Sequence, residues 1–313
     1  MGASRLKPAQ GDVFRYDFGE SAATIICCAL ETGESQSLHT ADEVSFSAGR
    51  STSKLHMSPG ASIADDLKTA AVLGGTTGLL GAVTVPLLLP SIYELVPPEQ
   101  RTLPLPLPLF CVVLAAQMLI IYGLLALVGL RLARACGREP APLLSALWIK
   151  KRPDGFGWGA GMALVTGVAC GIALVGAVAV IKSALPQTLP DTLHPSSFWG
   201  GLLASATASF GEEILCRLFL LSALLRILPV FNYSTALAVV VSALLFGALH
   251  APAAVFLFGG FQHVPHLCWV WMIALNALVG VACAVWYLRI GIGGAILAHF
   301  GTDLVWHVLS QLF

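Results

Sequence analysis

SFGEEILCRLF, residues 209–219, places two adjacent carboxylates and an arginine inside an apolar segment that runs from about Phe198 to Leu228. A segment of roughly 20 apolar residues is long enough to cross a bilayer. An ionised side chain at that depth costs ~2.5–3.5 kcal/mol on insertion scales, so such residues usually face a cavity and pair with one another. The segment therefore predicts a membrane helix whose charged side chains face a cavity or pair with one another.

Helical spacing determines which of these charges can meet. Glu213 and Arg217 are four residues apart, so on a helix they share one face and can pair. Glu212 is rotated by about 100° from Glu213 and is not held by that pairing. Taken alone, the group would also fit a purely structural ion pair, and the rest of the chain decides between the two interpretations.

The composition is that of an integral membrane protein. Of the 313 residues, 57% are hydrophobic and only 11% are charged, and the mean hydropathy is +0.82. Soluble domains carry roughly 25% charged residues. A net charge of zero gives no sign of nucleic-acid binding. The eight cysteines include no CxxC pair, which argues against a disulfide framework and against a cysteine metal site.

Apolar stretches separated by proline-rich or basic loops predict an all-α membrane protein of about seven spans, and the intramembrane charges predict that the spans are bundled around a polar cavity. The expected spans are residues 69–95, 109–130, 157–181, 198–228, 235–258, 267–288 and 292–313. The basic segment 131–152, which contains Trp148, is expected at the membrane interface.

Residues 1–68 differ from the rest of the chain and hold nine of its seventeen acidic residues. Short alternating patches separated by Gly and Ser predict a few short strands there, and residues 47–62 have the composition of a linker. We therefore divide the chain into an N-terminal cytoplasmic segment, 1–68, and a membrane domain, 69–313.

The distribution of basic residues predicts the orientation. With the amino terminus in the cytoplasm, fourteen of the seventeen Lys and Arg residues fall on that side, and only Arg101 and Lys182 fall on the other. This bias agrees with the positive-inside rule. We expect a multi-pass protein with its amino terminus in the cytoplasm and its carboxyl terminus on the opposite side.

Two further spans carry polar groups at depth. His250 lies in the fifth span, just before Pro252, which can kink a helix. His299 and Asp303 lie four apart in the last span and face one direction. One shared pocket is the simplest explanation for polar groups on three spans. The other histidines near tryptophans, His263, His266 and His307, are expected at the membrane interface.

These residue types fit two kinds of chemistry. A glutamate such as Glu212 can take a proton from water while a histidine steadies the water or donates to an oxyanion. Glu212, His250 and His299 are also possible ligands of a zinc ion, because zinc binds imidazole and carboxylate groups. The residues alone leave both mechanisms open.

The three motifs occur in a characteristic order, Glu212-Glu213-x-x-x-Arg217, Phe246-x-x-x-His250 and His299-x-x-x-Asp303. This set resembles the motifs of the CPBP family, the CaaX proteases and bacteriocin-processing or self-immunity proteins also called the Abi family. The resemblance covers about residues 198–313. It implies an intramembrane endopeptidase in which residues 198–313 are the catalytic core and the polar cavity is the catalytic cavity.

The resemblance also implies roles for the residues. Glu212 would activate water, His250 would assist it, and His299 with Asp303 would bind the water or stabilise the oxyanion. Glu213, counted with the catalytic group, would hold the motif helix together with Arg217, and Phe246 would give structural support. A glutamate-type protease without a required cofactor is favoured over a zinc enzyme.

The last motif departs from the family pattern, which commonly ends in Asn. Ionised Asp303 can only accept hydrogen bonds, whereas a protonated Asp303 would restore a donor. The expected partners are the bilayer and a lipidated or membrane-associated peptide or protein, with a cut C-terminal to a prenylated cysteine as one option. The alternatives are a non-proteolytic binding or self-immunity protein that keeps the pocket, and a transporter that relays protons.

Overall fold

A computed structural model of the chain describes residues 62–96, 98, 101–149, 155–184, 197–228 and 234–309. The regular elements of these residues are all helical, and no strand occurs among them. The strands and the linker expected before residue 62 lie outside the described residues. The all-helical part of the fold prediction is confirmed.

Five stretches of the described chain are long and apolar enough to cross a membrane, which makes this a multi-pass membrane protein. They correspond to five of the seven expected spans. The helices that form them are α2 (Ile63–Leu95), α3 (Leu107–Ala135), α5 (Phe156–Ala184), α8 (Ser234–Ala248) followed by α9 (Ala251–Leu257), and α10 (His266–Ile290).

The other two expected spans are also helical. Residues 198–227 form α6 (Phe198–Glu213), the π-helix η2 (Ile214–Leu221) and α7 (Ser222–Ile227) without a break. The last is α11 (Ile292–His307), with 16 residues. A π-helix is rare and often marks a functional site. Here it begins at the residue after the two glutamates.

The start of α2 shows why the first helix is longer than expected. The Ser62 hydroxyl accepts a hydrogen bond from the Asp65 backbone N–H at 3.2 Å. Such a cap stabilises a helix start, and the acidic first turn suits the positive end of the helix dipole. The helix therefore begins at Ile63, before the predicted start near Thr69.

A buried carboxylate joins α2 to α3 at this end. Asp66 is fully buried, and it pairs with Arg131 at 3.2 Å and with Arg134 at 3.0 Å. Arg134 also contacts Glu139 at 2.7 Å, next to the short helix α4 (Pro142–Ile149). Helix α4 lies in the expected interfacial segment, and Trp148 on it donates to Thr69 of α2 at 3.3 Å.

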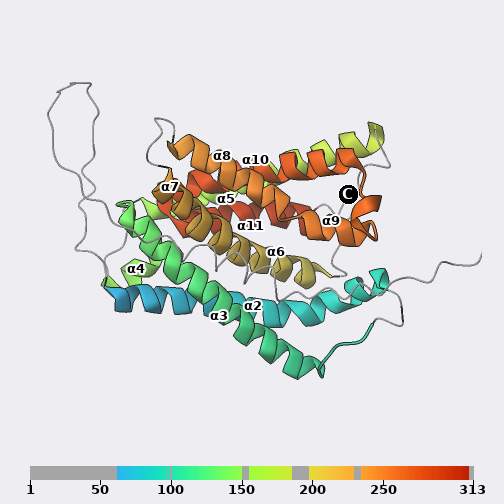
Figure 1. Cartoon of the computed structure of the whole chain (residues 1–313), viewed down its shortest axis with the longest axis horizontal. Coiled ribbons are helices and arrows are strands. Elements are labelled where there is room, and N and C mark those ends of the chain that lie inside the picture. Colours follow the sequence, from blue (N-terminus) through green and yellow to red (C-terminus); the bar gives the residue numbers. More distant parts are fainter. Residues whose placement is uncertain are drawn as a thin grey trace, which may run out of the picture. The chain divides into compact units, whose positions relative to one another are not determined.

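Helices pair along their lengths in the membrane domain. Figure 1 shows α2 in blue beside α3 in green, and contacts also join α5 to α11 and α8 to α10. Small residues permit the approach of α5 to α11. A Cβ on Gly167 would run into the Ala298 carbonyl oxygen, and one on Gly301 would lie 2.7 Å from the Leu164 carbonyl oxygen. Close backbone contacts of this kind are common between membrane helices.

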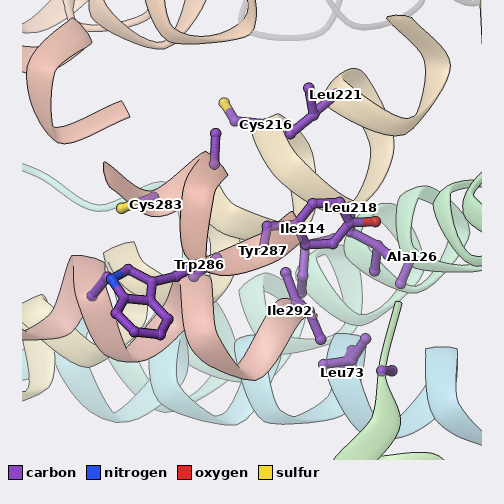
Figure 2. Packing of buried hydrophobic residues seen from close by; sticks show 14 of the residues in the cluster. Leu73, Ala126, Ile214, Cys216, Leu218, Leu221, Cys283, Trp286, Tyr287 and Ile292 are labelled. Carbon is purple, nitrogen blue, oxygen red and sulfur yellow. The ribbon is translucent and has the colours of Figure 1, made fainter. Parts of the chain in front are cut away.

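The main apolar core surrounds η2. Ile214, Leu218 and Leu221 of this π-helix are fully buried, and Figure 2 shows them among side chains from α2, α3, α10 and α11. The Ser242 hydroxyl of α8 donates to the Cys216 carbonyl oxygen at 3.0 Å, which satisfies a backbone acceptor of η2. The core thus fixes the chain immediately after the glutamate pair.

Candidate active site

Glu212 and Glu213 close α6 but occupy different environments. The Glu213 side chain is fully buried, whereas that of Glu212 is 36% exposed. The difference follows from helix geometry, because consecutive side chains point about 100° apart. One carboxylate therefore faces the protein interior and the other faces a cavity.

Glu213 is the centre of a buried polar group. Its Oε1 atom accepts from Arg217 Nη1 at 2.8 Å, and Arg217 Nη2 donates to the Gly280 carbonyl oxygen of α10 at 3.0 Å. Both side chains have no exposed surface. The predicted pairing of Glu213 with Arg217 is confirmed, and α10 supplies an additional acceptor for the guanidinium.

His299 connects this buried group to the cavity. Its Nδ1 lies 2.8 Å from Glu213 Oε1, and because an ionised carboxylate only accepts, Nδ1 carries the proton. Its Nε2 lies 3.9 Å from Glu212 Oε2 and 3.5 Å from Asp303 Oδ2. The expected common face of His299 and Asp303 on one helix is confirmed. Nδ1 of the imidazole is thus held by Glu213, and Nε2 faces the carboxylates of Glu212 and Asp303.

Phe246 of α8 touches three of these polar residues. The Arg217 guanidinium lies 4.4 Å from its ring centroid. The imidazoles of His250 and His299 pack edge-on at centroid distances of 5.1 and 5.5 Å. A ring face attracts cations, and edge-on packing is the favoured aromatic geometry. Phe246 therefore packs against two imidazoles and the guanidinium at once.

His250 lies at the break between α8 and α9. The break comes just before Pro252, in the first turn of α9, as expected from the sequence. His250 Nδ1 lies 3.0 Å from the Phe246 carbonyl oxygen, which can only accept, so Nδ1 carries the proton. In the neutral ring Nε2 is then an acceptor.

A cavity of about 270 Å³ brings most of the predicted residues together. Glu213 and Arg217 are not part of its lining. Its polar and aromatic lining consists of Glu212, Phe246, His250, Asn276, His299, Thr302, Asp303, Trp306 and His307. The remaining lining residues are apolar and come largely from α5, α9 and α10.

Several of these lining residues were not predicted from the sequence. His307 lines the cavity, a contact that its expected place in an interfacial belt did not include. A signal for it was present, since residues 299, 303 and 307 repeat at a spacing of four on one helix face. Asn276 is another such residue, and its signal was a polar amide in the predicted span 267–288.

One group of residues has donor atoms close enough to hold a metal ion. Among the described residues, Glu213, Cys283 and His299 offer ligand atoms that all lie within 4.8 Å of one another. Glu213 Oε1 already accepts a hydrogen bond from His299 Nδ1, and it accepts another from Arg217. The zinc ligands suggested by the sequence, Glu212, His250 and His299, do not form such a group within the described residues.

Comparison with known proteins gave a family match for the segment that carries the motifs. No curated protein and no solved structure matches the chain. Residues 194–305 match the family model described as Type II CAAX prenyl endopeptidase Rce1-like. The matched segment contains all three motifs, from Glu212 to Asp303. Residues 194–305 therefore form a segment similar to the Rce1-like type II CAAX prenyl endopeptidases.

Proposed function

We propose that this protein is a glutamate-type intramembrane endopeptidase in which Glu212 activates the attacking water. One observation carries the proposal. Glu212 faces the cavity across from Nε2 of His299 at 3.9 Å, while its neighbour Glu213 is enclosed with Arg217. The two carboxylates thus have separate roles: Glu212 would act on the substrate in the cavity, and Glu213 holds neighbouring side chains in place.

The distance between Glu212 and His299 suits a bridging water. At 3.9 Å the two atoms are too far apart for a direct hydrogen bond, but both can bond to one water between them. Glu212 would accept a proton as the water attacks the scissile carbonyl, a role worth roughly 10²–10⁴-fold in rate. Asp303, 3.5 Å from the same Nε2, would orient the ring when His299 is protonated on both nitrogens.

Three buried residues would position this pair. Glu213 fixes the His299 tautomer through Nδ1, and Arg217 neutralises the Glu213 charge. Phe246 packs on both histidines. We assign Glu213, Arg217 and Phe246 to positioning rather than to contact with the substrate. His250, with Nε2 as its acceptor, would assist proton transfer.

The lining of the cavity supports an apolar substrate. Its apolar walls include Leu174, Val178, Leu257, Met272 and Leu275, next to the polar end with Glu212. Such a surface suits a peptide that enters with an apolar or lipidated group. A peptide bond C-terminal to a prenylated cysteine is the substrate we propose, because the prenyl chain would occupy the apolar walls.

The orientation that we propose follows from the basic residues, with the amino terminus in the cytoplasm and the carboxyl terminus outside. Epitope tags at the two ends, probed by antibody in sealed vesicles of known sidedness, would test it. Both tags on one side would contradict the proposed number of crossings.

Purified protein in detergent should be incubated with a peptide library that includes a farnesylated CaaX peptide. Glu212→Gln should abolish cleavage, whereas Glu94→Gln, at an exposed glutamate of α2, should not change it. A chelator should leave the activity intact. Loss of activity with chelator and rescue by zinc would contradict the glutamate mechanism. No cleavage by the wild type would overturn the protease proposal and favour a binding or self-immunity function.

A further inference from the structure

With Glu212 and Asp303 ionised and His250 neutral, the proposed reaction needs a hydrogen-bond donor beyond these three side chains. When water attacks a peptide carbonyl, negative charge develops on the carbonyl oxygen and must be stabilised by a donor. The carboxylates of Glu212 and Asp303 accept hydrogen bonds when ionised, and neutral His250 presents Nε2 as an acceptor. His299 directs its Nε2 towards the two carboxylates.

Most other polar side chains that line the cavity are already engaged, which leaves few candidates for this donor. The Thr302 hydroxyl already contacts the carbonyl oxygens of Gly167 and Ala298, at 3.1 and 3.2 Å. Trp306 and His307 have interactions of their own. Asn276 is the one amide side chain in the lining that the structure describes.

Asn276 is suited to the task by its place and its chemistry. It lies in α10, is partly buried and lines the cavity with Glu212. One N–H of its amide donates to the Met272 carbonyl oxygen at 2.9 Å, which holds the side chain against its own helix. An amide nitrogen has two N–H groups, so the second is available to a ligand.

We propose that the second N–H of Asn276 binds the carbonyl oxygen of the scissile peptide bond. This assignment rests on the proposed protease function. As the water oxygen bonds to the carbonyl carbon, its proton passes to Glu212 and the carbonyl π electrons move to the oxygen facing Asn276. Return of these electrons breaks the C–N bond, and the proton held by Glu212 passes to the leaving amine.

The test compares two substitutions at this position. Asn276→Asp keeps the shape but loses the N–H donors, and Asn276→Leu keeps the volume and suits a membrane helix. Each should lower kcat by about 100-fold or more with KM within about threefold, because the interaction strengthens only in the transition state. Gln117→Leu, at an exposed amide of α3, is the matched control and should behave as the wild type.

The outcomes separate this inference from the function on which it rests. Wild-type cleavage that Glu212→Gln abolishes, together with unchanged kcat in either folded Asn276 variant, would overturn the role of Asn276 and leave the protease intact. A rise in KM alone would also overturn it, since Asn276 would then only line the binding surface. No cleavage by the wild type would overturn both proposals.

Discussion

Glu213 Oε1 lies 2.8 Å from Nδ1 of His299, although 86 positions separate the two residues in the chain. This contact joins α6 to α11 and determines which imidazole nitrogen carries the proton. The cavity consequently receives Nε2 of His299. A carboxylate that never touches the cavity thus controls the chemistry of a group that does.

Exchanging each adjacent glutamate for glutamine should separate stability from activity. Glu213→Gln leaves the Arg217 guanidinium buried without its counter-charge, and breaking a buried pair costs about 3–5 kcal/mol. Glu212→Gln changes a cavity-lining group and should leave the unfolding temperature close to that of the wild type while abolishing cleavage. Thermal unfolding in detergent, measured with activity, checks both. Equal destabilisation by the two substitutions would contradict the distinct environments.

Gly167→Ala should weaken the packing of α5 against α11. The new Cβ would collide with the Ala298 carbonyl oxygen, and overpacking of this kind costs about 1–3 kcal/mol. Ala298 precedes His299, so activity should fall as well. Gly176→Ala in the same helix is the control, because a Cβ there has no neighbour within 4 Å. Unfolding temperatures that match for the two variants would argue against this close contact.

Asp66 and Asp65 offer a matched pair at the start of α2. Asp66→Asn removes the charge that holds Arg131 and Arg134, and hydrogen bonds to charged groups are worth about 1.5–3 kcal/mol. Asp65→Asn affects an exposed pair with Lys68 and should cost much less. Chemical denaturation of both variants measures the difference. A larger loss from Asp65→Asn would show that the cap of α2 matters more than its link to α3.

Cys283→Ala tests the candidate metal group directly. If Glu213 and His299 only form hydrogen bonds with each other and with Arg217, and bind no metal, the variant should keep its activity within about threefold. A conservative change in a packed core permits this. Cys216→Ala, at another fully buried cysteine, controls for lost volume. Zinc content by mass spectrometry accompanies the assay. Loss of bound zinc and of activity in Cys283→Ala alone would establish a metal centre.

Much of this architecture could be predicted because hydropathy and helical spacing are local properties. Hydropathy predicted the helices, and helical spacing predicted the Glu213–Arg217 pair and the common face of His299 and Asp303. The early start of α2 could not be placed as well, because it depends on whether Ser62 acts as a cap. The π-helix η2 has no periodic signature in eight residues, so only its packing shows it.

Contacts between helices far apart in sequence were beyond local patterns. The packing of Phe246 on Arg217, His250 and His299 depends on how α6, α8 and α11 meet. The same holds for the Asn276 side chain, since an asparagine in a membrane helix can face either a neighbouring helix or a cavity. Its direction follows from the placement of α10.

The buried group around Glu213 also sets an order of events during biogenesis. Arg217 follows within one turn, but the Gly280 carbonyl comes 63 residues after Arg217, and His299 comes 86 residues after Glu213. A ribosome therefore releases the two charges well before their remaining partners. Until α10 and α11 have been inserted, the nascent chain holds an incomplete polar centre, and the proposed catalytic group is not yet assembled.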